Sequence, residues 1–191
     1  MFGFPATTCC GDTPQDNSFK GSWADFYANN RLRFILRRAE KSNGMDKELH
    51  NFVETTASKV VPRLIGDDHL NNGKGVTPVV VHGDLWSGNA SVGTIGAKGG
   101  DAEAVVYDSS ACYAHNEYEL GIMNMFGGFG GSFLNEYHEL CPKTEPVEEY
   151  GDRVKLYELY HHLNHYAMFG GGYRSGAVGI MKSLVKKYGQ E

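Results

Sequence analysis

The spacing of apolar side chains predicts two helices in the first third of the chain. After Ser22, which can cap a helix at its amino end, apolar residues recur every three or four positions, and Asn43-Gly44 provides a stop. Asp46 can cap a second helix, whose apolar side runs on to Val61. The first twenty residues are interrupted by glycine, proline and asparagine, which predicts an irregular segment.

The spacing changes from helical to extended in the middle of the chain. A polar, glycine-rich loop over 66–78 is followed by Val79-Val80-Val81, which predicts a short buried strand. Two further short strands are predicted near 90–95 and 102–108, joined by a turn-rich segment over 96–101.

Helical spacing returns in the last third, with helices predicted near 117–126, 132–140, 152–168 and 175–188. We find no internal repeat, no βαβ pattern and no dinucleotide fingerprint after a strand. The pattern therefore predicts a mainly α fold with a small β cluster, in one domain over residues 1–191.

Composition narrows the class of protein. Lys and Arg total 18 against 23 Asp and Glu, a formal net charge of −5, which argues against nucleic acid or an anionic membrane as the main partner. No apolar run approaches the ~20 residues of a membrane-spanning helix, and the first residues lack the features of a secretory signal. Four cysteines without a C-x-x-C motif indicate reduced thiols, so we expect a cytoplasmic protein.

The chemistry-bearing residues follow the predicted strands. The first strand leads directly into His82-Gly83-Asp84, and Asn89 comes five residues after the aspartate. A later predicted strand ends in Asp108. Phosphoryl transfer from Mg-ATP needs one carboxylate to take or orient the proton of a hydroxyl, with an amide oxygen and a second carboxylate to hold Mg²⁺. The pattern therefore favours a kinase-type site.

A simpler interpretation exists for part of this motif. An aspartate and an asparagine five residues apart also occur in ordinary turns, where their side chains bond to the backbone. The preceding apolar run and the later Asp108 make the kinase interpretation the stronger one. We interpret His82 as a brace of the loop rather than as a proton carrier.

At this point the chain resembles a known family. The segment HGDLWSGN over 82–89 is similar to the catalytic loop of the fructosamine-3-kinase (ketosamine-3-kinase) family, in the aminoglycoside-phosphotransferase-like branch of the protein-kinase-like superfamily. CCG over 9–11, EYELGIMNMFGGF over 117–129, EYHELCPK over 136–143 and YELYHHLNHYAMFGGGYRSG over 157–176 also resemble family segments, in the same order.

The resemblance implies a role for each matching residue. Asp84 matches the catalytic base, while Asn89 and Asp108 match the two Mg²⁺ ligands. Trp86 matches an aromatic residue beside the substrate sugar. Glu119 matches an acidic residue that supports the catalytic loop, as His82 is also expected to do.

The segment over 157–176 raises two alternatives. His161 and His165 stand four apart, as in some zinc sites, but the glutamate that follows the first histidine in H-E-x-x-H enzymes is absent. The resemblance instead implies that this helix lines the substrate side of the cleft, with Asn164 and His165 in contact with the sugar. The competing interpretation is that these residues pack in the helix with their polar ends toward solvent.

Two further stretches have structural interpretations. The aromatic residues Phe126, Phe129, Phe133 and Tyr137 are predicted to fill core between helices. Four arginines, at positions 31, 33, 37 and 38, are predicted to form a solvated cationic helix face.

The chain departs from the family pattern in two ways. The usual Asp-Pro-Ala at the metal-binding turn is replaced by Asp108-Ser109-Ser110, which removes a backbone restraint but no ligand. The glycine-rich loop, lysine strand and helical glutamate of a kinase amino-terminal lobe are not found. We therefore expect residues 1–191 to be the carboxyl-terminal, large lobe only, without the amino-terminal ATP-binding lobe, and to be inactive alone.

The resemblance implies an ATP- and Mg²⁺-dependent kinase that phosphorylates the sugar 3-hydroxyl of ketosamines. Its substrates would be ketosamine-modified lysines of glycated proteins or small ketosamines, and phosphorylation would promote deglycation. Its further partner would be the amino-terminal lobe of the same protein. Two alternatives stay open, namely a small-molecule kinase of the aminoglycoside or choline type, and a non-catalytic lobe that binds a sugar or a partner.

Overall fold

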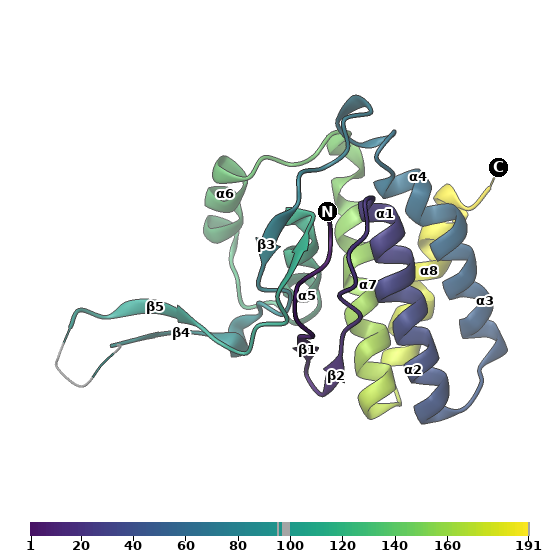
Figure 1. Ribbon diagram of the computed structural model, residues 1–191, viewed down its shortest axis with the longest axis horizontal. Coiled ribbons are helices and arrows are strands. Elements are labelled where there is room, and N and C mark those ends of the chain that lie inside the picture. Colours follow the sequence, from purple (N-terminus) through teal and green to yellow (C-terminus); the bar gives the residue numbers. More distant parts are fainter. Residues whose placement is uncertain (95, 97–99, 191) are drawn as a thin grey trace.

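Helices form the body of the molecule, and short strands lie along one side of it (Figure 1). The computed structural model describes residues 1–94, 96 and 100–190. The mainly helical fold with small sheets agrees with the sequence prediction. None of the described helices is long and apolar enough to cross a membrane.

The first predicted helix is one continuous helical stretch with a wider central turn. It comprises α1 (Trp23–Phe26), the π-helical η1 (Tyr27–Arg33) and α2 (Phe34–Asn43). The Ser22 hydroxyl accepts a hydrogen bond from the Asp25 amide at 3.4 Å, and the stretch ends at Gly44 with a positive φ of 85°. Both boundary signals in the sequence therefore act as predicted.

The second predicted helix is likewise confirmed. Its parts are α3 (Lys47–Thr55), the π-helical η2 (Thr56–Val60) and α4 (Val61–Ile65), and a short 3₁₀ turn, η3 (Leu70–Asn72), follows in the polar loop. Asp46 caps it by accepting a hydrogen bond from the Leu49 amide at 3.1 Å.

The carboxyl-terminal part of the chain contains further helices. They are η5 (Asn116–Glu119), α5 (Leu120–Phe126), α6 (Gly131–Leu140), η6 (Val147–Glu149), α7 (Tyr150–Phe169) and α8 (Tyr173–Tyr188). Helix α7 is central, because it packs against α2, α5 and α8 (Figure 1). Its buried side chains, such as Leu156, Tyr157 and Leu163, join Trp23 and Leu32 in one apolar core.

The strands of the described residues form three two-stranded antiparallel sheets. In these, β1 (Cys9–Cys10) pairs with β2 (Thr13–Pro14), β3 (Val79–Val81) with β6 (Cys112–Ala114), and β4 (Ala90–Gly93) with β5 (Glu103–Val106). The β4–β5 hairpin projects away from the helical body (Figure 1). The sequence did not predict β1, β2 or β6, which are too short to show an alternating pattern. Part of the predicted 96–101 turn and position 95 lie outside the described residues.

Three interpretations of the sequence need correction. The β3 strand is not fully buried, since Val79 is 40% and Val80 62% exposed, because β6 is its only described strand partner. Arg31 is not solvated but fully buried, and its guanidinium donates to the Asp16 carbonyl and the Asn17 side chain.

The aromatic stripe divides between two sites, which is the third correction. The rings of Phe129, Phe133 and Tyr137 pack on a small apolar cluster that includes Leu120, as predicted. Phe126 instead remains 39% exposed and lines a pocket. It stands at the end of α5, where the next residue begins a loop.

Candidate active site

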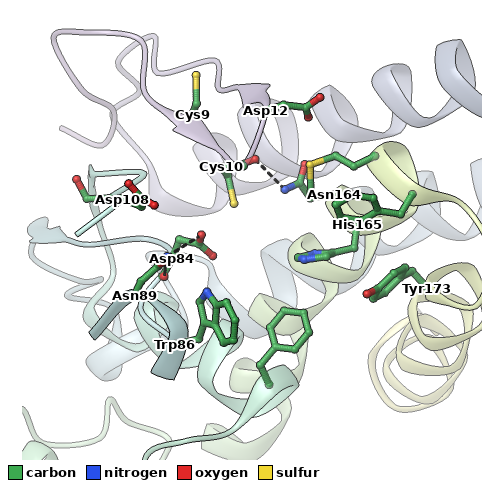
Figure 2. Close-up of a pocket in the computed structure, with 15 residues that line it drawn as sticks. Cys9, Cys10, Asp12, Asp84, Trp86, Asn89, Asp108, Asn164, His165 and Tyr173 are labelled. Carbon is green, nitrogen blue, oxygen red and sulfur yellow. Dashed lines mark hydrogen bonds between the residues drawn. The ribbon is translucent and has the colours of Figure 1, made fainter. Parts of the chain in front are cut away.

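A pocket of about 910 Å³ lies where β1, the loop after β3 and the last turns of α7 meet. It is lined by Cys9, Cys10, Gly11, Asp12, Asp84, Trp86, Asn89, Asp108, Ser109, Phe126, Asn164, His165, Met168, Phe169 and Tyr173. Figure 2 shows Asp84, Asn89 and Asp108 on one side, with Trp86 beside them, and His165 and Tyr173 across from them. The fold thus gathers the predicted catalytic, metal and substrate residues around one cavity.

The Glu119 carboxylate holds the loop that carries Asp84 through hydrogen bonds to its backbone. Glu119, at the end of η5, accepts hydrogen bonds from the amides of His82 at 2.6 Å and Gly83 at 3.0 Å. Gly83 has a φ of +80°, and a Cβ there would lie 2.5 Å from the Ser110 carbonyl oxygen. Glycine is therefore required at this position both for its backbone angle and for the close approach.

The His82 imidazole connects the two loops that lead into the pocket. Its Nε2 lies 2.9 Å from the Tyr107 carbonyl oxygen, and its Nδ1 accepts a hydrogen bond from the Asp84 amide at 3.3 Å. Burial lowers the pKa of His82, which favours the neutral ring. This is the geometry that a bracing role needs, and that role for His82 and Glu119 stays a prediction.

Among the described residues, Asp84 has few partners for a carboxylate in a partly buried position. Its Oδ2 accepts one hydrogen bond, from Asn89 Nδ2 at 3.2 Å, and the same nitrogen donates to the Asp84 carbonyl at 2.9 Å. Burial raises the pKa of Asp84 to about 6, with a smaller contribution from the negative charge of Asp108, while the Asn89 hydrogen bond acts in the opposite direction. A base of this kind changes protonation state close to neutral pH.

Asp108 and Asn89 provide the oxygen atoms that a magnesium ion prefers. Asp108 lies two residues beyond the end of β5 and has a positive φ of 56°, so it occupies a turn rather than the strand end that the sequence predicted. Asn89 binds Asp84 through its nitrogen, and its Oδ1 takes no part in those bonds. Carboxylate and amide oxygens beside one cavity are a donor set that fits Mg²⁺.

A row of aromatic rings extends from the Asp84 loop to the amino-terminal end of α8. The centroids of Trp86 and Phe126 lie 5.3 Å apart, those of Phe126 and His165 5.1 Å, and those of His165 and Tyr173 5.1 Å. A Cβ at Gly88 would lie 2.2 Å from Trp86 Cζ2, so only glycine there leaves room for the indole. A wall of rings beside carboxylates suits a sugar, which has apolar faces and polar edges.

Asn164 has a packing role in this structure. Its Nδ2 donates to the Cys10 carbonyl at 3.1 Å, its Oδ1 accepts from the Thr13 hydroxyl at 2.6 Å, and its side chain is fully buried. It thereby attaches the β1–β2 hairpin to α7. The sugar contact predicted for Asn164 stays a prediction, and His165 has the more accessible side chain of the two.

Several lining residues were missed by sequence reasoning. Met168 and Phe169 follow Asn164 and His165 by one helical turn, so the period of α7 could have identified them. Tyr173 begins α8 at the same end. Cys10 and Asp12 carry no such signal, because only the fold brings the first residues of the chain to the pocket.

The chain is similar in sequence to a kinase family model and to named kinases. A family model described as fructosamine kinase matches residues 1–187. The chain is 38% identical over 186 residues to a protein of Mus musculus named ketosamine-3-kinase, and 39% identical over 186 residues to one of Oryza sativa subsp. indica named protein-ribulosamine 3-kinase, chloroplastic. Both alignments cover 97% of this chain, and 54% and 49% of those relatives, so the chain spans about half their length.

The fold is also similar to solved structures. A protein of Thermobifida fusca YX-ER1 assigned as a fructosamine-3-kinase superposes with a TM-score of 0.75 at 28% identity, covering 97% of this chain and 58% of that one. A second structure, from Haemophilus somnus 129PT, gives a TM-score of 0.72 at 21% identity and supports the fold alone. Because the family model matches residues 1–187, which is nearly the whole of this chain, the chain belongs to the fructosamine kinase family.

Proposed function

We propose that this chain is the large lobe of an ATP-dependent ketosamine kinase, which phosphorylates the sugar 3-hydroxyl of fructosamines or ribulosamines. The observation that carries the proposal is the pocket that Asp84, Asn89 and Asp108 share with the aromatic wall. The names of the relatives, ketosamine-3-kinase and protein-ribulosamine 3-kinase, supply the substrate class. Phosphorylated ketosamines on protein lysines or small amines would then decompose, which is deglycation.

In the proposed reaction Asp84 accepts the proton of the sugar hydroxyl as that oxygen attacks phosphorus. The raised pKa of Asp84 suits this role, because a base works best when its pKa lies near the working pH. His82 and Glu119 would hold the Asp84 loop in place through the hydrogen bonds described above. Trp86 would stack on the sugar, with His165 on the neighbouring edge.

Magnesium would be held by Asn89 and Asp108, and would neutralise charge on the phosphates of ATP. The carboxylate of Asp108 would provide the full negative charge of the pair, and the amide of Asn89 a neutral oxygen. The bond from Asn89 Nδ2 to Asp84 would at the same time fix the distance between the base and the metal ligands.

We further propose that the nucleotide site is completed by an amino-terminal lobe of the same protein, and that residues 1–191 are one domain with very low turnover alone. Large apolar side chains on β3 and at the end of β5 remain exposed, namely Val80 at 62%, Val106 at 59% and Tyr107 at 46%. Exposed apolar groups beside a site are typical of a surface that a partner covers.

A cytoplasmic location is also part of the proposal. All four cysteines are free in the structure, which suits a reducing compartment. The rice relative is named chloroplastic, so the compartment of this protein has to be measured. Imaging of a tagged copy would decide between the two.

The test is a substrate panel. The chain, fused behind an amino-terminal lobe of a family member, would be given Mg-ATP and a ketosamine, an aminoglycoside or choline, with the product identified by mass spectrometry and phosphorus NMR. We expect phosphate on the 3-hydroxyl of the ketosamine, and no product from the Asp108→Ala variant. Phosphorylation of another compound would favour the aminoglycoside or choline type of kinase. Sugar binding without any phosphorylation would favour a non-catalytic lobe.

A further inference from the structure

A second group of ligand atoms lies beside the pocket, separate from Asn89 and Asp108. The Cys10 thiol, an Asp84 carboxylate oxygen and an imidazole nitrogen of His161 all lie within 4.8 Å of one another. They come from β1, the loop after β3 and α7. Figure 2 shows the Cys10 sulfur directed toward Asp84.

His161 is the unusual member of this group. Its side chain is fully buried, and neither Nδ1 nor Nε2 has a hydrogen-bond partner among the described residues. The neighbouring histidines do have partners, since His162 pairs with Glu158 and His165 Nδ1 bonds to the His161 carbonyl oxygen. A buried polar group without a hydrogen-bond partner destabilises the folded chain, so binding of a ligand to the His161 imidazole would be favourable.

The donor atoms select for the type of ion. Thiolate and imidazole favour Zn²⁺ and similar thiophilic ions, whereas Mg²⁺ prefers oxygen ligands and keeps several of its waters. Bond lengths of about 2.0–2.3 Å in a tetrahedral zinc site imply ligand atoms roughly 3.3–3.8 Å apart. The three atoms would therefore need to approach one another by at most roughly 1.0–1.5 Å on binding the ion.

We propose that Cys10, Asp84 and His161 form a binding site for a thiophilic divalent cation such as Zn²⁺. Cys10 and Asp84 both line the pocket, so the fourth ligand position would face the cavity and take water. On binding, the thiol loses its proton to solvent and the sulfur forms the bond to the metal. If the proposed function also holds, the ion inhibits the kinase, because it removes Asp84 from the substrate hydroxyl.

Cobalt is the probe for this site, because Co²⁺ bound by a thiolate gives a charge-transfer absorption that Co²⁺ on oxygen or nitrogen ligands alone lacks. The 191-residue chain would be titrated with Co²⁺ and then with Zn²⁺. We expect one equivalent to produce the band and Zn²⁺ to abolish it. The measurement needs neither ATP nor sugar, so its result does not depend on the proposed kinase activity.

Matched variants identify the ligands. Cys10→Ser should abolish the band. His161→Gln should weaken cobalt binding at least about tenfold, because residues that only support a metal ligand already change the affinity by that much. The controls are Cys9→Ser, which removes the exposed neighbouring thiol, and His162→Gln, which removes the adjacent imidazole. Both controls should retain the wild-type band and affinity.

Circular dichroism and thermal melts would establish which variants fold. If Cys10→Ser does not fold, His161→Gln decides the outcome alone, since it keeps a polar side chain of similar length. Absence of the thiolate band in the wild-type chain would overturn the proposal, and a bound water would then be the partner of the three atoms. A band that persists at full affinity in His161→Gln, or disappears in Cys9→Ser, would overturn it as well.

Discussion

Glu117 lies in η5 and Asp84 on the loop after β3, and the surroundings of the two carboxylates are opposite. Glu117 is fully buried and its two carboxylate oxygens accept from Arg153 Nε at 2.7 Å, Arg153 Nη2 at 3.1 Å and the Thr144 amide at 2.8 Å. Asp84 has a single side-chain donor, Asn89, and no cation beside it in the described structure. The first carboxylate is completely satisfied, and the second is left with free acceptor capacity.

The difference teaches how the fold separates stability from chemistry. Arg153 also donates to the carbonyls of Pro146 and Thr144, so the pair attaches the segment before α7 to the helix itself. A charge paired and hydrogen-bonded in this way is fixed in one state. Asp84 is instead held by its backbone, through the Glu119 contacts to the preceding residues, while its carboxylate stays available.

Breaking the Glu117–Arg153 pair should have the largest effect on stability. Arg153→Met leaves the Glu117 carboxylate buried without its cation, so we expect a loss of about 3–5 kcal/mol in the free energy of unfolding, measured in urea. The matched control is Lys187→Met, which removes a lysine that is 54% exposed from its pair with Asp152 and should cost at most about 1 kcal/mol. Recovery of stability in the double variant Glu117→Gln/Arg153→Met would show that the unpaired Glu117 charge causes the loss. Equal losses of stability in Arg153→Met and Lys187→Met would contradict the structural role of the Glu117–Arg153 pair.

The pH dependence of turnover should follow Asp84. Its pKa is raised to about 6, so the carboxylate is charged above that pH and protonated below it. Since only the charged form accepts the substrate proton, turnover of the fused kinase should fall about tenfold between pH 7 and pH 5. A turnover that stays constant down to pH 5 would contradict the assignment of the base to Asp84.

The smallest expected effect is a gain in stability from Asp84→Asn. The folded-state pKa of Asp84, about 6, lies above its ordinary value of 3.8, so folding disfavours the charged form. The protonated carboxyl of Asp84 therefore contributes stability that is lost as the pH rises from about 4 to about 6. A neutral amide at this position avoids that loss. Allowing for partial exposure, we expect a gain of about 1 kcal/mol at pH 8, a rise of roughly 2–4 °C in Tm, and none at pH 4.

A contrasting variant tests whether that gain is specific to the pocket. Lys187 and Tyr188 donate hydrogen bonds to Asp152 and lower its pKa, so Asp152→Asn should lower the Tm at pH 8. If both substitutions raise the Tm, the gain at Asp84 reflects a lower overall negative charge. The chain carries a formal net charge of −5, so this control is necessary.

The sequence predicted the helices well because their signals are local. Ser22, Gly44 and Asp46 act within one turn of the chain, and each is found at the boundary it predicts. Strands of two or three residues have no such periodic signal. The burial of Arg31 could not be read from its charged neighbours on the same helix, since its partners Asp16 and Asn17 lie in an irregular segment.

The sequence predicted those pocket residues that belong to one short motif. Asp84, Trp86 and Asn89 lie within six residues, and the resemblance of that motif to the family implied a role for each of them. Cys10 and His161 are 151 residues apart, and only the packing of β1 on α7 places them beside Asp84. Contacts of that kind arise from tertiary structure, which the spacing of residues does not reveal.

Turnover of the fused kinase with and without the Asp84 carboxylate is the measurement that tests the central claim most directly. Asp84→Asn keeps the size of the side chain and both proposed metal ligands, but it removes the proton acceptor. We expect kcat for the ketosamine to fall about 10²–10⁴-fold, while the Kd for Mg-ATP, measured by calorimetry, stays at its wild-type value. An unchanged kcat, or a fall in kcat that is matched by a loss of Mg-ATP binding, would contradict the role of Asp84 as the base.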